Sequence, residues 1–324
     1  ISIFNEAIRL TGLCDSLRQY IDPTYSCGED SVNQDMVIST GGSSYTMRYV
    51  GTRMKRYTAF VETDEVYAAN GIYDLDGLKA HAKQVYDQMY PKDAGLYDDD
   101  WTNRKNPLNR FISYHLLPYY GAYNDWTVSG DIKNTCAKTD LIDCTDWYTT
   151  MLQGTIMKMS TPSEGLFINR KGVGVRYTVR GTKVLSPSEI GDVDQQALNG
   201  IYHYIDQVLD YNQETRDVVF NDRIRVMAAT LSPEFMNCGA RGNTERATGF
   251  KVVEGWDFHG KTPTMTLRKR DVWMVTYADC IDMVGQFDVT FKLLPVPKEG
   301  TYEVRFGYGW GDMRGKVQVY FGTD

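Results

Sequence analysis

This chain of 324 residues has no hydrophobic run of about 20 residues, the length that a membrane-spanning helix needs. It also shows no signal peptide and no lipid-attachment cysteine, because it opens directly within a helical pattern. We therefore expect an export signal, and any lipid anchor to a membrane, to lie upstream of Ile1.

An excess of positive charge is also absent. The 42 acidic residues outnumber the 35 basic residues and leave a net charge of −7. The densest basic cluster, residues 268–270, is followed at once by Asp271, which is typical of a solvated strand end. The charge therefore argues against binding to nucleic acid.

The motifs of common catalytic and metal sites are missing. The four histidines form no His-x-x-x-His pair, and the chain has no Gly-x-Ser-x-Gly elbow and no P-loop. The six cysteines show no Cys-x-x-Cys spacing. Cys136 and Cys144 are near enough in sequence to close a disulfide loop, and buried free thiols are the alternative. We expect no cofactor and no metal.

Carboxylates are abundant but show no decisive pattern. Asp98, Asp99, Asp100 and Asn103 offer oxygen ligands, but their spacing does not match an EF-hand loop, so we expect a solvated acidic loop. A carboxylate pair for glycoside hydrolysis stays open, because 42 acids offer many pairs and sequence fixes no distances.

Tyrosine, in contrast, is plentiful, with 23 copies against 12 of phenylalanine. A phenol ring combines apolar area with a hydrogen-bonding hydroxyl and suits a wet binding surface. Tyrosine also fits half-buried strands, and both interpretations stay open.

The most informative segment is residues 199–209. Asn199-Gly200 is a turn dipeptide, and the alternation after it predicts a half-buried strand. Two faces result: Ile201, His203 and Ile205 on one, and Tyr202, Tyr204 and Asp206 on the other. His203, between two isoleucines, is expected to be a satisfied core residue.

Two earlier segments complete a pattern. Residues 57–67 predict a strand that runs into a helix with Thr63 as its N-cap. Residues 109–118 predict a short amphipathic helix that carries the pair Tyr114-His115 and is ended by Pro118. A longer amphipathic helix, ended by Pro91, is predicted between them.

In this order, the three segments resemble the fasciclin-like domain, a module of cell-surface adhesion proteins. Its motifs read Thr-x-Phe-x-x-Thr before a helix, then Tyr-His, then Asn-Gly before a last strand. The matching residues are Thr58, Phe60, Thr63, Tyr114, His115, Asn199 and Gly200. Val61-Glu62 departs from the pattern, which usually has Ala-Pro there.

The resemblance implies that Phe60, Tyr114, His115 and Ile205 come together in one core. We expect His115 to pack on the apolar face of its helix and to hydrogen-bond a backbone carbonyl. A catalytic role needs an orienting partner, which the sequence does not name.

The pattern of elements predicts an α+β fold for residues 1–212, because helices gather early with strands before and after them. Residues 213–324 differ, since apolar residues alternate over 287–293, 302–308 and 317–321 and predict an antiparallel sandwich or jelly roll. This second part resembles a galactose-binding-like β-domain that follows fasciclin-like domains in surface lipoproteins of Bacteroidetes. In that family the chain continues beyond the equivalent of Asp324.

Two aromatic groups are candidate binding residues. An aromatic ring stacks on the apolar face of a sugar while neighbouring polar groups bind its hydroxyls. The first group lies in the predicted β-domain and the second follows the Tyr-His helix: Tyr308, Trp310, Asp312 and Arg314, then Tyr119, Tyr120 and Trp126. Coverage of the protein core by these rings is the alternative.

These features predict a non-enzymatic adhesion or binding protein at the cell surface, an outer-membrane lipoprotein that recognises an extracellular protein or glycan. A polysaccharide-acting enzyme with an unrecognised carboxylate pair is the alternative. A structural subunit of an envelope assembly is a third possibility.

Overall fold

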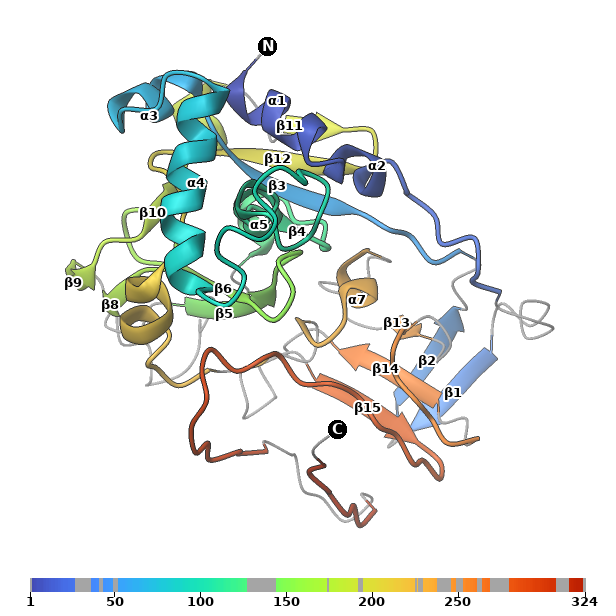
Figure 1. Ribbon diagram of the computed structural model, residues 1–324. Coiled ribbons are helices and arrows are strands. Elements are labelled where there is room, and N and C mark those ends of the chain that lie inside the picture. Colours follow the sequence, from blue (N-terminus) through green and yellow to red (C-terminus); the bar gives the residue numbers. More distant parts are fainter. Residues whose placement is uncertain are drawn as a thin grey trace.

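The computed structural model describes residues 2–26, 36–40, 43–48, 52–126, 144–173, 175–191, 195–224, 226, 230–237, 246–248, 253–260, 264–268, 280–306 and 315–322. They contain helices together with two larger β-sheets and one small one (Figure 1). The expected α+β character is confirmed. The helices are α1 (Ile3–Leu10), α2 (Leu13–Leu17), α3 (Asp64–Ala69), α4 (Leu75–Met89), α5 (Pro107–Tyr114), α6 (Pro187–Ile190) and α7 (Pro233–Asn237).

The first sheet has eight strands in the order β4-β3-β12-β10-β7-β6-β5, with β11 paired to β12 as well. Its strands are β3 (Tyr57–Glu62), β4 (Leu116–Leu117), β5 (Cys144–Thr149), β6 (Ile156–Thr161), β7 (Leu166–Ile168), β10 (Thr182–Val184), β11 (Gln195–Ala197) and β12 (Gly200–Ile205). A separate hairpin joins β8 (Lys171–Val173) to β9 (Arg176–Val179).

Local sequence signals account for the helices of this part. The Thr63 side chain accepts a hydrogen bond from the Val66 amide and caps α3, as predicted. Asp74 caps α4 in the same way, and α4 ends at Met89, two residues before Pro91. Asn106 caps α5, which has proline at its first position and ends at Tyr114.

The centre of the first sheet is a parallel pair, β3 beside β12, which places Phe60 opposite His203. The strands approach closely at their start, where a Cβ on Gly200 would lie 2.4 Å from the Tyr57 carbonyl oxygen. Asn199 receives the Tyr57 amide on its own carbonyl and donates its side-chain amide to the Leu17 carbonyl. Gly200 is therefore required by this close approach, and the Asn199 side chain ties the junction to the end of α2.

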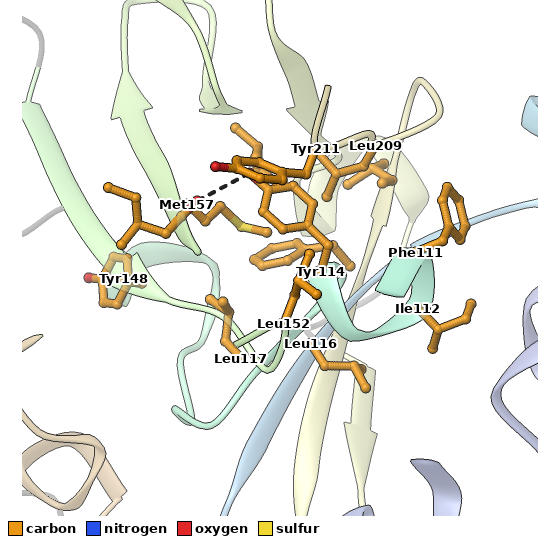
Figure 2. Packing of buried hydrophobic residues seen from close by; sticks show 14 of the residues in the cluster. Phe111, Ile112, Tyr114, Leu116, Leu117, Tyr148, Leu152, Met157, Leu209 and Tyr211 are labelled. Atoms are coloured by element: carbon orange, nitrogen blue, oxygen red, sulfur yellow. Dashed lines mark hydrogen bonds between the residues drawn. The ribbon is translucent and has the colours of Figure 1, made fainter. Parts of the chain in front are cut away.

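One hydrophobic core lies between the helices and the first sheet. Phe60, Tyr114 and Ile205 all belong to it, and His115 packs against Phe111 with ring centroids 4.5 Å apart. Figure 2 shows Tyr114 in its centre, with residues of the sheet on one side and Leu209 on the other. The expected gathering of these motif residues is confirmed.

The second sheet has the order β1-β2-β13-β14-β15 and is built from both ends of the chain. Its strands are β1 (Met36–Thr40), β2 (Ser43–Arg48), β13 (Arg246–Thr248), β14 (Thr264–Arg268) and β15 (Cys280–Val284). Strands β1 and β2 lie within residues 1–212, the first predicted part, yet they join the second sheet through the parallel pair β2–β13. Strand pairing therefore does not follow the contiguous division predicted at residue 212.

Helix α7 lies between the two sheets (Figure 1). Met236 belongs to the large core, and Phe235 belongs to a smaller cluster with Val253, Phe258 and Met265. The Asn237 side chain also bonds the segment after β4, with its oxygen 2.8 Å from the Tyr120 amide nitrogen. One short helix thus connects the two parts.

The strands predicted in the tail are not present in its described portion. Residues 285–306 and 315–322 form one isolated bridge, Asp257 with Thr290, and no longer strand. Their alternating apolar side chains stay exposed, at 62% for Phe306 and 64% for Phe321. The described residues of this part supply three strands, β13, β14 and β15, to the five-stranded sheet, and the predicted second layer of a sandwich is not formed among them.

Candidate functional site

The first candidate is a buried polar cluster around Glu62, the last residue of β3. Its Oε1 atom lies 2.8 Å from Nε2 of His115 and accepts the Leu209 amide at 3.0 Å. Its Oε2 atom accepts the Tyr67 hydroxyl at 3.0 Å. The Glu62, Tyr67 and His115 side chains, which we name the Glu62 cluster, are fully buried.

Hydrogen bonding fixes the charge of the Glu62 cluster. Nδ1 of His115 lies 2.8 Å from the Phe111 carbonyl oxygen, which only accepts, so this nitrogen carries a proton. Nε2 faces Oε1 of Glu62, an oxygen that also accepts the Leu209 amide, so a proton on Nε2 completes this hydrogen bond. His115 is therefore an imidazolium paired with the Glu62 carboxylate.

The pKa of His115 agrees with this assignment. Burial lowers the pKa, but the charge of Glu62 and the bonds to Glu62 and Phe111 together hold it above its ordinary value. Burial first, and the Glu62 charge second, raise the pKa of Tyr67 well above its usual range, so Tyr67 stays protonated and donates.

The Glu62 cluster is a structural element, because none of its members reaches solvent. The expectation that His115 bonds a backbone carbonyl is confirmed, and so is the core position of His203, whose Nε2 lies 2.9 Å from the Gly121 carbonyl oxygen. Sequence reasoning missed Glu62 as the partner of His115. The available signal was the alternation of β3, which puts Glu62 on the same face as Phe60.

A second histidine–carboxylate pair lies nearer the surface. Nε2 of His81 is 3.0 Å from both oxygens of Asp210, and the two side chains are 27% and 15% exposed. The bond to Asp210 raises the pKa of His81 against the opposing effect of burial. An oriented histidine is half of a general-base arrangement. The His81 ring also makes an edge contact with Phe111, and the hydrogen bonds of its side chain among the described residues are those to Asp210.

The structure corrects the predicted binding role of two of the three aromatic residues after the Tyr-His helix. Trp126 is fully buried between Phe60 and Tyr148, and Tyr119 is 1% exposed with its hydroxyl 2.8 Å from Thr149 Oγ1. Both rings complete the core, which was the alternative interpretation. Tyr120 alone reaches the surface, where its hydroxyl donates to Gln196 at 3.0 Å beside the edge strand β11.

The outer face of the β3–β12 pair is the second candidate. Tyr57, Tyr202 and Tyr204 lie on it, all partly exposed, and the small side chain of Ala59 lies opposite Tyr202. The Tyr202 and Tyr204 rings are 5.5 Å apart in a T-shaped contact, and the Tyr202 hydroxyl donates to Gln195 at 3.0 Å. We name these three tyrosines the tyrosine face.

The other predicted residues are placed as follows. Tyr308, Trp310, Asp312 and Arg314 lie outside the described residues. Thr58 is buried and donates to the Tyr119 carbonyl, while the Tyr114 hydroxyl donates to the Ile156 carbonyl. Thr58 and Tyr114 thus contribute hydrogen bonds inside the fold.

Metal and membrane sites are not evident in the described portion of the chain. No group of three metal-ligating side chains occurs there, and no helix there has the length and apolarity needed to cross a bilayer. The acidic loop is tied to nearby cations, with Asp98 2.6 Å from the Lys83 ammonium and Asp93 bonded to Arg110. Asp99 and Asp100 are exposed, as expected for a solvated loop, whereas Asp98 is partly buried.

Comparison with known proteins identifies no family. No protein-family model matches the chain, and no curated protein matches it.

Proposed function

We propose that the protein is a non-enzymatic binding protein of the cell surface whose tyrosine face contacts an extracellular protein or glycan. The observation that carries this proposal is the contrast between two sets of polar aromatic groups. The Glu62 cluster is sealed from solvent, whereas Tyr57, Tyr202 and Tyr204 remain partly open on the sheet.

The position of the tyrosine face supports a binding role. Parallel strands are usually covered on both faces by helices and then carry aliphatic side chains. Here the inner face of β3 and β12 is buried, while the outer face carries phenol rings at intermediate exposure. Rigid rings with polar tips give contact area at low entropic cost, which favours recognition of a protein or a sugar.

The resemblance to fasciclin-like adhesion modules supports the same proposal, because the motif residues gather as that resemblance implies. Location at the outer membrane through a lipid anchor is part of the proposal and rests on the resemblance alone.

The test is binding of the full chain to a glycan array and to extracellular proteins. Tyr202→Ala is expected to weaken binding about tenfold or more, the effect of a central interface aromatic. Tyr73→Ala is the matched control, since Tyr73 is 75% exposed and lies between α3 and α4. Equal losses in both variants, or release of sugar products from polysaccharides by the purified chain, would contradict the proposal.

A further inference from the structure

The hairpin β8–β9 and its flanks stand out by charge. Residues 165–188 contain five basic side chains and no acidic one, in a chain whose net charge is −7. These basic residues are Arg170, Lys171, Arg176, Arg180 and Lys183. The hairpin pairs with neither larger sheet and lies at the left edge of the molecule in Figure 1.

The hairpin is held in a defined shape. Gly172 has a φ of +141° at a register shift in β8, and a Cβ there would lie 2.3 Å from the Arg176 carbonyl oxygen. The Arg170 guanidinium lies 4.7 Å from the Phe167 ring centre and 4.3 Å from that of Tyr177, so it joins the hairpin to β7. The Lys171 ammonium donates to the Asn221 carbonyl at 2.8 Å. These contacts restrain a two-stranded unit that is marginal by itself.

Nearby carboxylates neutralise most, but not all, of this charge. Arg180 pairs with Asp206 and Lys183 with Glu189, and Arg170 lies 3.8 Å from Glu164. Asp222 is shared between two ammonium groups, those of Lys158 at 3.0 Å and Lys171 at 3.4 Å.

Arg176 is exposed and has no ion pair among the described residues. A positive charge therefore remains at the tip, beside Val175 at 72% exposure and Tyr177 at 48% exposure.

We propose that the β8–β9 hairpin binds an acidic polysaccharide, with Arg176 bound to a carboxylate or sulfate group and Tyr177 packed against a sugar ring. Guanidinium binds such anions through two parallel hydrogen bonds. A partly exposed aromatic ring next to it favours a sugar over a bare anion. This surface is separate from the tyrosine face, so the inference does not depend on the proposed function.

The test measures binding of the full chain to polygalacturonate and heparin, with neutral dextran as reference. At low salt, Arg176→Glu is expected to weaken binding about tenfold or more, and Arg176→Gln less. Added salt is expected to weaken binding of the unaltered chain, because exposed charges are screened. Arg9→Glu is the matched control, since Arg9 is exposed on α1.

Three results would overturn the inference. They are absence of binding to both polyanions, an equal loss in Arg9→Glu, and binding to vesicles of anionic phospholipid without binding to either polysaccharide. Tyr202→Ala is expected to leave polyanion binding unchanged, which separates this test from that of the tyrosine face. Melting curves of each variant establish that the exposed substitutions leave the fold intact.

Discussion

The Glu62–His115 pair gives the sharpest prediction. Glu62→Gln keeps the size of the side chain and removes the charge that holds a buried imidazolium. Breaking a buried, hydrogen-bonded ion pair from one side costs about 3–5 kcal/mol. We therefore expect the free energy of unfolding of the full chain to fall by about this amount, a large part of the roughly 5–15 kcal/mol typical of a domain.

Controls separate the charge from the packing. Tyr67→Phe removes a single hydrogen bond to the same carboxylate and is expected to cost about 1.5–3 kcal/mol. Glu65→Gln changes an exposed carboxylate three residues further on, in the first turn of α3, and is expected to change the free energy of unfolding much less than Glu62→Gln does. Urea unfolding at constant pH measures all three variants.

The pH dependence has a definite sign. The folded-state pKa of His115 is raised above the unfolded value of about 6.5. Its contribution to stability is therefore fully present below that unfolded value and is lost as pH rises through the folded pKa. In Glu62→Gln the carboxylate charge that offsets burial is gone, so the pKa of His115 is expected to fall below its ordinary value.

Nuclear magnetic resonance of the imidazole rings measures the pKa of His115 in the unaltered chain and in Glu62→Gln. The reasoning is refuted if His115 of the unaltered chain is neutral at pH 6.5, or if Glu62→Gln leaves its titration unchanged. An unfolding free energy that falls no more in Glu62→Gln than in Glu65→Gln would refute the energetic part.

Two further predictions concern the close approach at Gly200 and the hydrogen bond between Asp210 and His81. Gly200→Ala is expected to destabilise the chain by about 1–3 kcal/mol, because its Cβ would lie 2.4 Å from the Tyr57 carbonyl oxygen; Gly315→Ala, which meets nothing within 4 Å, is the control, and equal melting temperatures would contradict the close approach. Asp210→Asn is expected to lower the pKa of His81 towards about 6.5, since the bond to Asp210 is the main cause of its raised value. The stability due to that pair is present below about pH 6.5 and declines as pH rises through the raised pKa, so a His81 titration unaffected by Asp210→Asn would disprove the assignment.

Local signals in the sequence predicted the elements that carry the first part of the fold. The cap Thr63, the helix that stops before Pro91 and the strand after Asn199-Gly200 each depend on neighbouring residues, and each is found in place. The gathering of Phe60, Tyr114 and Ile205 in one core is found in the structure, but it was predicted only from the resemblance to the fasciclin-like domain, because no local rule brings distant segments together.

The features that the sequence did not predict depend on contacts between segments far apart in the chain. Glu62 meets His115 only because β3 and the end of α5 pack together, and a charged residue in a strand is ordinarily expected to face water. The residue type of Trp126 fits a sugar-binding surface and a protein core equally well. Its complete burial shows that it belongs to the core. In the tail, alternation predicted strands, but a strand also needs a neighbour, and residues 301–306 have none among the described residues.

The parallel pairing of β2 with β13 has a practical consequence for anyone who wishes to divide the molecule. A fragment cut after residue 212 would retain β1 and β2 but lose the three strands that continue their sheet. Strand β2 would become an edge strand whose unpaired backbone amides and carbonyls can bond to other copies of the fragment and promote aggregation. Binding measured with such a fragment could then be an artefact of truncation. Adhesion is therefore best measured on the intact chain.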